Sequence, residues 1–305
     1  MRALTIDAGP RRLGRSELCA FPIAYGCWRF AGTTVREGRE KFESAREIGI
    51  DLFDHADIYG GEGAAEDLFG RVLAEEPRLR APILLATKCG IVPGVPYDSS
   101  KEHILRSCEG SLRRLRTDVI DVYQIHRPDF LGHPHEIADA FIELRGAGKI
   151  REVGVSNYTP SQFEALQAAL PFPIATHQPE FSAWHLAPLR DGVLDQCLRH
   201  GITPLAWSPL ARGLLGLGAD EARSKPHGER LAALVACLDD IGAREQVSRA
   251  AVALAFVLAH PAQAIPIIGT QRAERIRDCA AALRVSLSRA DWYRIVVASQ
   301  GENLP

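Results

Sequence analysis

Three apolar runs decide the fold, namely IDLFD at 50–54, ILLATK at 83–88 and VIDVYQIH at 119–126. Each run is short and is followed by a stretch with helical spacing, which is typical of a buried parallel strand. The runs end in titratable side chains, which are Asp54, Lys88 and His126. Such residues suit a core poorly, but the carboxyl ends of parallel barrel strands are where active-site residues gather. The runs therefore predict a parallel α/β protein with a functional site at one face.

The same alternation of strand and helix continues along the chain. We expect strands near 22–26, 51–54, 83–88, 119–125, 150–155, 174–178, 202–207 and 264–268. We expect helices near 34–48, 62–76, 100–115, 135–147, 160–169, 186–200, 229–241 with 246–259, and 271–282. Eight such units predict a closed (β/α)8 TIM barrel that occupies 1–305 as one domain. An open doubly wound sheet is the alternative, but its usual Gly-rich turn is missing after the first strand, at 26–29.

Three segments lie outside the repeat. Residues 2–18 are extended and polar, and we expect them to cap the barrel. Residues 287–298 predict an added helix that begins after Ser288 as N-cap. The long interval 208–263 holds a Gly-rich loop at 208–228, which could cover a ligand.

The composition favours a globular enzyme. Of 305 residues, 46% are apolar and 24% are charged, and the net charge is −2, which argues against a nucleic-acid or membrane partner. The longest apolar stretch, 250–259, is too short to span a membrane, and 1–18 lacks the apolar core of a signal peptide. Seven cysteines without a Cys-x-x-Cys pair indicate reduced thiols in a cytoplasmic protein and no zinc site.

The strand-end residues, together with Tyr59, suit the reduction of a carbonyl group. Hydride addition makes an alkoxide, which a tyrosine can protonate if a nearby lysine lowers its pKa. Asp54 would keep Lys88 charged, and His126 would orient the carbonyl oxygen. Each residue alone also has an ordinary interpretation, as a salt bridge, a structural histidine or a packed tyrosine. Their placement on successive strand ends favours the catalytic interpretation.

Several motifs carry a resemblance to a known family. FDHADIYG at 53–60 resembles the Asp-x-Ala-x-x-Tyr-Gly signature of the aldo/keto reductases. The family's other motifs follow in order as GVSN at 154–157, Gln178, WSPL at 207–210 and IPIIGT at 265–270. The resemblance extends from about residue 12 to 299 and is closest to a bacterial subgroup of the YdhF type.

The resemblance implies a (β/α)8 barrel that binds a nicotinamide dinucleotide, usually NADPH. It assigns the carboxamide to Ser156, Asn157 and Gln178, and it stacks the nicotinamide on Trp207. It assigns the pyrophosphate to Ser208, Leu210 and Gly213.

For the adenosine end, the resemblance implies that Gly269 and Thr270 open a helix whose amides hold a phosphate. Arg275 would bind the 2′-phosphate with help from Arg272, and Asp278 would contact the adenine. The alternative is that the arginines of this helix form a solvated face. Gly269 stands where several members have lysine, and Cys279 stands where many have asparagine.

The substrate pocket is less clear from the sequence. Trp28, Tyr97, Arg127 and Phe130 follow strands one, three and four and could reach it. Arg127 would either attract an anionic group or form a surface ion pair. Only eight residues follow Val297, so we expect an open site for small aldehydes, ketones or dicarbonyls.

Two other functions remain open. The first is a regulatory subunit of the same fold that binds the cofactor and senses redox state, similar to potassium-channel β-subunits; slow single turnover would favour it. The second is a non-redox barrel lyase or isomerase, which would leave Trp207 and the Gly-x-Ser-Asn motif without a purpose. The sequence leaves the physiological carbonyl and the oligomeric state undecided.

Overall fold

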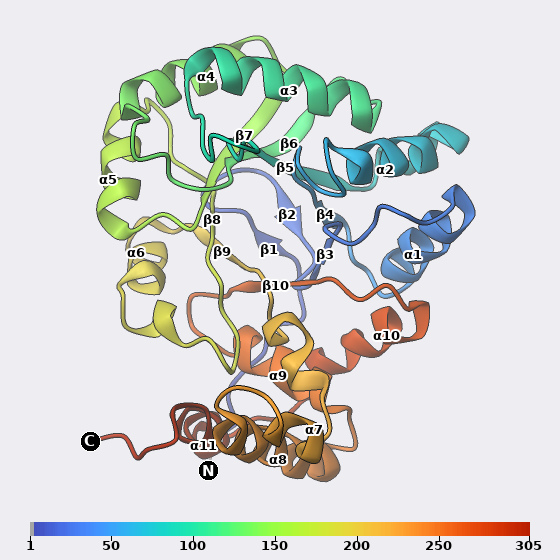
Figure 1. Ribbon diagram of the computed structural model, residues 1–305, viewed down its shortest axis with the longest axis vertical. Helices are drawn as coiled ribbons and strands as arrows, with labels where there is room; N and C mark the ends of the chain where they lie inside the picture. The colour runs from blue at the N-terminus through green and yellow to red at the C-terminus, as the bar shows by residue number, and fades with distance from the viewer. Residues whose placement is uncertain (1–2) are drawn as a thin grey trace.

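The computed structural model describes residues 3–305 and contains a closed barrel of eight parallel strands surrounded by helices (Figure 1). Around the barrel the strands follow the order β10, β3, β4, β5, β6, β7, β8, β9. Their bounds are β3 (Ala24–Gly26), β4 (Leu52–Asp54), β5 (Leu84–Cys89), β6 (Ile120–Ile125), β7 (Ile150–Ser156), β8 (Thr176–Gln178), β9 (Thr203–Ala206) and β10 (Ile265–Ile268). Pairing of Ile267 with Ala24 closes the ring, which confirms the barrel and excludes the open sheet.

Helices follow the strands in the predicted order. Their bounds are α1 (Val35–Glu47), α2 (Ala64–Glu75), α3 (Lys101–Leu115), α4 (Pro134–Gly146), α5 (Pro160–Ala169), α6 (Val193–His200), α8 (Gly228–Glu245), α9 (Arg249–Leu258) and α10 (Ala273–Asp278). Thr159 caps α5 as expected, because its hydroxyl accepts from the backbone of Gln162, whose side chain reaches back to Thr159. Between residues 3 and 305, no helix is both long and apolar enough to cross a membrane.

Two predicted helices are wrong in their extent. The segment 186–200 is interrupted, because Gly192 adopts a φ of 86° and the Asp191 side chain accepts from the backbone of Val193, where α6 begins. The segment 271–282 begins only after Arg272, as α10, and continues as a 3-10 helix, η4 (Cys279–Arg284).

The interval 208–228 is also more ordered than predicted. It contains a 3-10 segment, η3 (Ala211–Gly216), and a short helix, α7 (Ala219–Arg223), which packs beside α8. Ser208, Ala211 and Arg212 all have positive φ, a region that residues with side chains rarely adopt. Contacts with the rest of the protein therefore hold this backbone in a conformation that the residues themselves disfavour.

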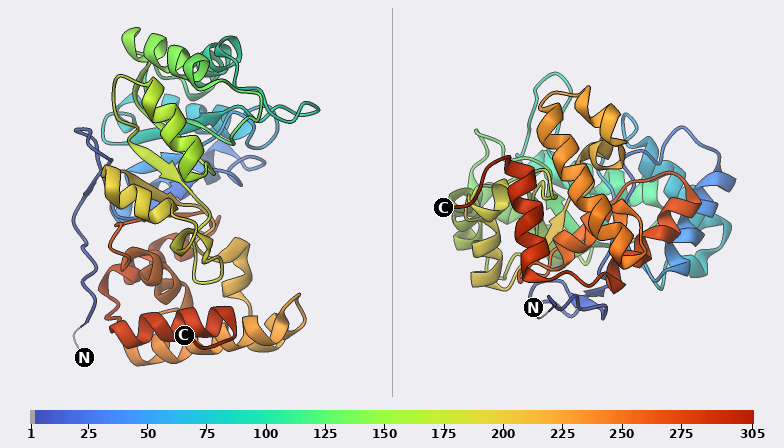
Figure 2. Two further views of the ribbon diagram at one scale, coloured as in Figure 1. Left: turned by 90° about the vertical axis from the view of Figure 1, so that its left-hand side faces the viewer. Right: turned by 90° about the horizontal axis from the view of Figure 1, so that it is seen from below.

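The amino-terminal segment caps the barrel, as predicted from residue 3 onward; residue 2 lies outside the described residues. Its strands β1 (Arg11–Arg12) and β2 (Cys19–Ala20) pair in antiparallel fashion. Arg11 donates to the carbonyl oxygen of Ala264 at 2.6 Å, and Leu13 and Leu18 pack with the lower barrel interior. The segment before β1 runs as an extended strip along one side of the molecule (Figure 2).

The added carboxyl-terminal helix is present as α11 (Arg289–Gln300), and Ser288 caps it in a capping box. It lies along α8, at the opposite end of the view from α3 and α4 (Figures 1 and 2). Trp292 of α11 stacks on Phe256 of α9 with 4.8 Å between ring centroids.

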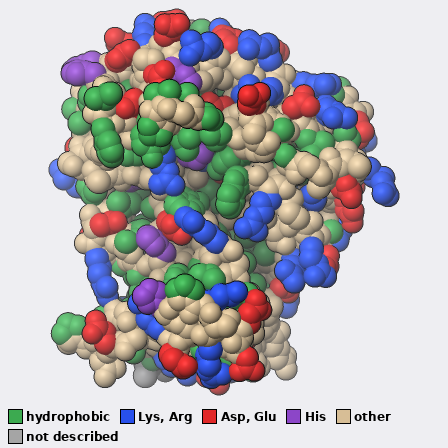
Figure 3. All heavy atoms as spheres, viewed as in Figure 1, with side chains coloured by type: hydrophobic (Ala, Val, Ile, Leu, Met, Phe, Trp, Pro, Cys, Tyr) green, Lys and Arg blue, Asp and Glu red, His purple; other side chains and the backbone are tan. Residues whose placement is uncertain are grey.

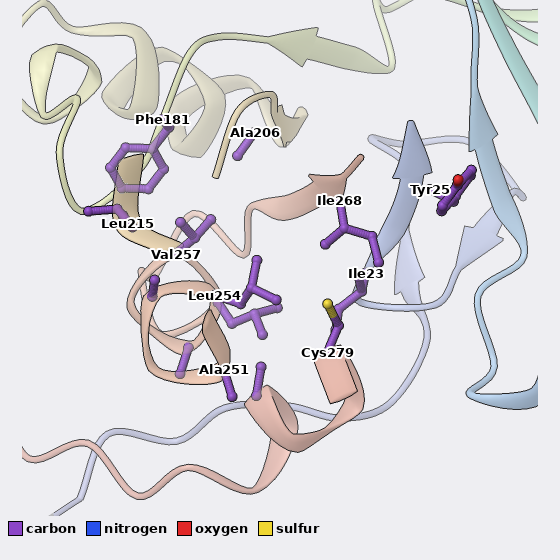
Figure 4. Close-up of a cluster of buried hydrophobic side chains, with 14 of the residues drawn as sticks. Ile23, Tyr25, Phe181, Ala206, Leu215, Ala251, Leu254, Val257, Ile268 and Cys279 are labelled. Carbon is purple, nitrogen blue, oxygen red and sulfur yellow. The ribbon is translucent and has the colours of Figure 1, made fainter. Parts of the chain in front are cut away.

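The main core lies between the barrel strands and the surrounding helices. Figure 4 shows Leu254 and Val257 of α9 among Phe181, Ile268 and Ile23. This apolar layer fixes the last strands of the barrel, whose carboxyl ends bear the candidate site.

Candidate active site

The predicted strand-end residues meet at one end of the barrel. Asp54 is the last residue of β4, Lys88 lies in β5, and His126 follows β6. Parallel pairing aligns Asp54 with Ala86 and Lys88 with Gln124, so the polar side chains share the carboxyl end. The structure therefore brings together residues that are far apart in the sequence.

Asp54 and Lys88 form a buried ion pair. The Lys88 ammonium donates to both carboxylate oxygens of Asp54 at 2.8 Å and to the carbonyl oxygen of His55 at 2.5 Å. Burial alone lowers the pKa of Lys88, but Asp54 and Tyr59 together raise it above its ordinary value. Lys88 therefore stays charged although its side chain is fully buried.

Tyr59 lies in the turn after β4, and its ring is 5.0 Å from the Lys88 ammonium. Burial raises the pKa of Tyr59, and the opposing effect of Lys88 does not outweigh it. Lys88 does lower this pKa, as expected, but loss of solvent has the larger effect, so the expected net fall of the Tyr59 pKa is wrong. Tyr59 consequently holds its proton.

His126 faces Tyr59, with 5.7 Å between ring centroids. Burial holds its pKa well below the ordinary histidine value, and the charges of Lys88 and Arg127 lower it further. Its Nδ1 is buried without a hydrogen-bond partner among residues 3–305. The imidazole is therefore neutral near pH 7 and carries a single ring proton.

A second polar cluster behind these residues was not predicted from the sequence. Glu66 of α2 is fully buried and accepts from Thr87 at 2.5 Å and from Arg114 at 2.8 Å. Burial, and then Glu66, raise the pKa of nearby Asp57 to about 7. The sequence signal for this cluster was an acidic residue, Glu66, on the inner face of a predicted helix, because a buried charge needs a partner. The cluster joins the residue before Lys88 to the turn that carries Tyr59.

Ser156, Asn157 and Gln178 lie together beside this group. The Ser156 hydroxyl donates to the Gln178 carbonyl oxygen at 2.9 Å, and Asn157 donates to the Ser156 hydroxyl at 2.7 Å. Gln178 also donates to Asp54 at 2.9 Å, a link that was not predicted. Its amide nitrogen is thereby used, which leaves Oε1 without a partner among residues 3–305.

Trp207 follows β9, and its indole N–H donates to Asn157 at 3.0 Å. Two guanidinium groups lie near its ring centroid, those of Arg127 at 5.7 Å and Arg212 at 5.5 Å. Arg212 also approaches Glu180 at 3.7 Å. The segment that follows contains Ser208, Leu210 and Gly213, whose assignment to the pyrophosphate stays a prediction.

The residues assigned to an adenosine end lie after β10. Gly269 and Thr270 precede α10 by a short loop and do not open the helix, because Arg272 is its N-cap. Arg272 pairs with Glu274, and the neighbouring Arg277 pairs with Glu47. Arg275 is exposed and has no carboxylate partner within the described chain, so it differs from the two paired arginines.

Asp278, at the end of α10, accepts a hydrogen bond from Ser248 at 2.5 Å. Because that serine also caps α9, the Asp278 carboxylate already has a structural contact. The buried Cys279 thiol has a raised pKa because of burial and contacts the carbonyl oxygen of Arg275.

Loops after β3, β5 and β6 form a rim with exposed apolar side chains. Trp28 is 56% exposed and Phe130 is 84% exposed, and the Tyr97 and Phe130 rings lie 6.5 Å apart. Figure 3 shows hydrophobic and basic side chains around a hollow on this face. Arg127 forms no ion pair with any residue of 3–305, so the surface ion pair considered for it is wrong.

Metal-binding groups and the thiol next to Lys88 in the sequence were the remaining reactive groups to locate. Across residues 3–305, no three His, Cys, Asp or Glu side chains lie together as a metal-binding group. Cys89 is buried, and burial raises its pKa well above the ordinary value, as in an unreactive thiol.

Comparisons with known proteins show the family and the fold. The chain matches the model of the aldo/keto reductase family over residues 22–299. It is 43% identical to the 6-dehydroglucose reductase of Novosphingobium aromaticivorans over the full length of both, and 38% identical to the oxidoreductase YdhF of Escherichia coli over 95% and 96% of the two chains. A glycerol dehydrogenase from Gluconobacter oxydans superposes with a TM-score of 0.84 at 28% identity, over 98% and 97% of the chains. The chain belongs to the aldo/keto reductase family.

Proposed function

We propose that this protein reduces small aldehydes and ketones to alcohols with NADPH, and that Tyr59 donates the proton. One observation carries the proposal: Lys88, in a buried ion pair with Asp54, has its Nζ 5.0 Å from the centroid of the Tyr59 ring, and a neutral His126 faces that ring. A buried charge pair is costly to build for stability alone, so its position at the mouth of the barrel favours a catalytic role.

The four residues have complementary roles in the proposed reaction. The bound nicotinamide would supply a hydride to the carbonyl carbon. Tyr59 holds its proton before the reaction and would pass it to the carbonyl oxygen as negative charge develops there. The charge of Lys88 would stabilise the resulting tyrosinate, and Asp54 would keep Lys88 charged and in place.

His126 would orient the carbonyl. Because its Nδ1 is enclosed without a partner, its Nε2 is the atom that remains for a ligand. A neutral imidazole that is protonated there donates one hydrogen bond to the carbonyl oxygen. This donor would strengthen as the oxygen becomes an alkoxide, so its effect would be largest in the transition state.

The residues assigned to the cofactor fit its groups. The free Oε1 of Gln178 can accept from an amide N–H, and the ring of Trp207 offers a flat surface for a planar heterocycle. The positive-φ segment from Ser208 to Gly213 would border the pyrophosphate. Arg275, which lacks an acidic partner in the described structure, supports binding of a 2′-phosphate and therefore a preference for NADPH over NADH.

The relatives support a carbohydrate-like carbonyl compound as substrate. The Novosphingobium relative, 43% identical, is named a 6-dehydroglucose reductase. We therefore extend the expected small carbonyls to aldehydes and ketones of sugar type.

The test is NADPH oxidation with glyceraldehyde, a dicarbonyl and an aromatic aldehyde, for wild type and Tyr59→Phe. We expect wild-type turnover and a fall in kcat of about a hundredfold or more in the variant, since a positioned acid contributes about that much. Tyr293→Phe, at an exposed position of α11, is the matched control and should retain activity. Equal rates for wild type and Tyr59→Phe would refute the assignment of the proton donor.

Cofactor preference has a separate test. Arg275→Met should weaken NADPH binding more than NADH binding, because only NADPH carries the 2′-phosphate. Titration of both cofactors by fluorescence measures this difference. An equal loss for the two would mean that Arg275 does not contact that phosphate.

A further inference from the structure

Arg127 is a half-buried arginine whose donors are unused. It directly follows His126, and its guanidinium carbon lies 5.7 Å from the centroid of the Trp207 ring. It is close enough to His126 to lower the pKa of that imidazole. Within residues 3–305 it forms neither an ion pair nor a side-chain hydrogen bond.

Two other half-buried arginines have hydrogen-bond partners for their guanidinium groups. Arg80 donates to the carbonyl oxygens of Ile83 and Val119 and to Asp121. Arg114 is bound by Glu66. Partly buried donors without acceptors cost free energy. Arg230, over the Trp184 ring at 4.2 Å, also lacks an acceptor among residues 3–305, so Arg127 is distinguished by its place beside His126.

We propose that Arg127 is a specificity-determining residue that binds oxygen atoms on the carbons next to the reacting carbonyl. This inference rests on the proposed function, in which His126 orients that carbonyl. The residue after His126 is placed to meet the neighbouring substituents of the same molecule. A guanidinium offers a planar pair of donors that two adjacent oxygens can fill.

The guanidinium carbon of Arg127 lies 5.7 Å from the centroid of the Trp207 ring, which is the ring proposed to carry the nicotinamide, so Arg127 lies near the reacting end of the site. The substrate oxygen atoms that accept hydrogen bonds from Arg127 can belong either to vicinal hydroxyl groups or to an oxyanion such as a phosphate. The substrate class is therefore the oxygen-substituted aldehydes and ketones, rather than plain hydrocarbon carbonyls.

The experiment compares three aldehydes of equal carbon number, namely propanal, glyceraldehyde and glyceraldehyde 3-phosphate. For wild type, we expect kcat/KM for at least one of the two oxygenated aldehydes to exceed that for propanal. In Arg127→Met, the ratio to propanal should fall about ten- to hundredfold, the usual effect of losing a charge-assisted hydrogen bond. A larger fall for the phosphate identifies an oxyanion, and a larger fall for glyceraldehyde identifies hydroxyl groups.

Arg289→Met is the matched control. Arg289 also lies over an aromatic ring, 5.3 Å from the centroid of Tyr293, and it is an exposed residue at the start of α11, away from the site. This variant should leave the three ratios unchanged. Arg127→Lys keeps the charge but loses the planar pair of donors, so its ratios should lie between those of wild type and Arg127→Met. It also decides the question if Arg127→Met does not fold.

Unchanged ratios in both Arg127 variants would overturn the inference. Equal wild-type reduction of all three aldehydes would also overturn it, while leaving the proposed reductase activity intact. Failure of wild type to reduce any of them or the wider carbonyl panel would instead count against the proposed function itself.

Discussion

Replacement of Asp54 by asparagine would leave the Lys88 ammonium buried without a counter-charge. Both oxygens of Asp54 lie 2.8 Å from Lys88 Nζ, and the Lys88 side chain is fully buried. Breaking one partner of a buried pair costs about 3–5 kcal/mol in comparable cases. We expect Asp54→Asn to lose that much free energy of unfolding near neutral pH.

The pH dependence of the loss follows from the sign of the pKa shift of Lys88. In wild type, Asp54 and Tyr59 raise this pKa, so stability from the lysine persists at neutral pH and is lost only in strong alkali. In Asp54→Asn, burial dominates and the folded pKa falls below the unfolded one. The unfolded chain then binds more protons, so the variant should regain stability as the pH rises towards the ordinary pKa of lysine.

Urea unfolding of wild type and Asp54→Asn, between about pH 6 and about pH 9, measures both effects. The midpoint of the variant should approach that of wild type as the pH rises. The control is Glu143→Gln, which removes an exposed ion pair with Lys101 and should change the midpoint very little. A constant difference between wild type and Asp54→Asn at every pH would refute the reasoning.

Three further predictions concern stability and reactivity. Burial lowers the pKa of His55 to about 3, so the folded state keeps it neutral while the unfolded chain takes up a proton below about pH 6.5. The free energy of unfolding should therefore fall as the pH is lowered from 6.5, by at most about 5 kcal/mol from this residue, and the urea midpoint with it; His55→Phe should show a shallower decline. Gly63 has a φ of 82°, and an added Cβ would lie 2.2 Å from Arg114. Gly63→Ala should lower the thermal midpoint and also kcat, because Arg114 binds Glu66 and both influence the pKa of Asp57 in the turn before Tyr59; a variant with wild-type values of both would contradict this. Mass spectrometry after brief alkylation should find the exposed Cys19 modified and the buried Cys89 intact, whereas rapid modification of Cys89 without unfolding would show that its burial is incomplete.

The sequence predicted the barrel because its strands are short apolar runs separated by helical stretches, a pattern set by burial alone. It also indicated the candidate catalytic residues, since Asp54, Lys88 and His126 stand at the carboxyl ends of apolar runs and Tyr59 follows the first of these. Helix boundaries were less certain, because they depend on single backbone conformations such as that of Gly192. Three-dimensional packing also orders the interval 208–228 as η3 and α7, where the sequence predicted a Gly-rich loop that could cover a ligand.

Interactions between distant segments could not be predicted from local patterns. The bond from Gln178 to Asp54 joins residues 124 positions apart, and the cluster around Glu66 joins α2, α3 and β5. The direction of the Tyr59 pKa shift could not be predicted either, since it depends on whether burial or Lys88 has the larger effect. Only the packed structure decides that balance.

The most direct test of the proposed activity follows the hydride itself. NADPH labelled with deuterium at the transferable position of the nicotinamide ring would be mixed with wild-type protein and glyceraldehyde, and the product would be examined by mass spectrometry. The account predicts that the glycerol formed carries one deuterium on the former carbonyl carbon, and that Tyr59→Phe forms little of it. Tight binding of NADPH without any label in the product, for glyceraldehyde and for the other carbonyls tested, would contradict the account.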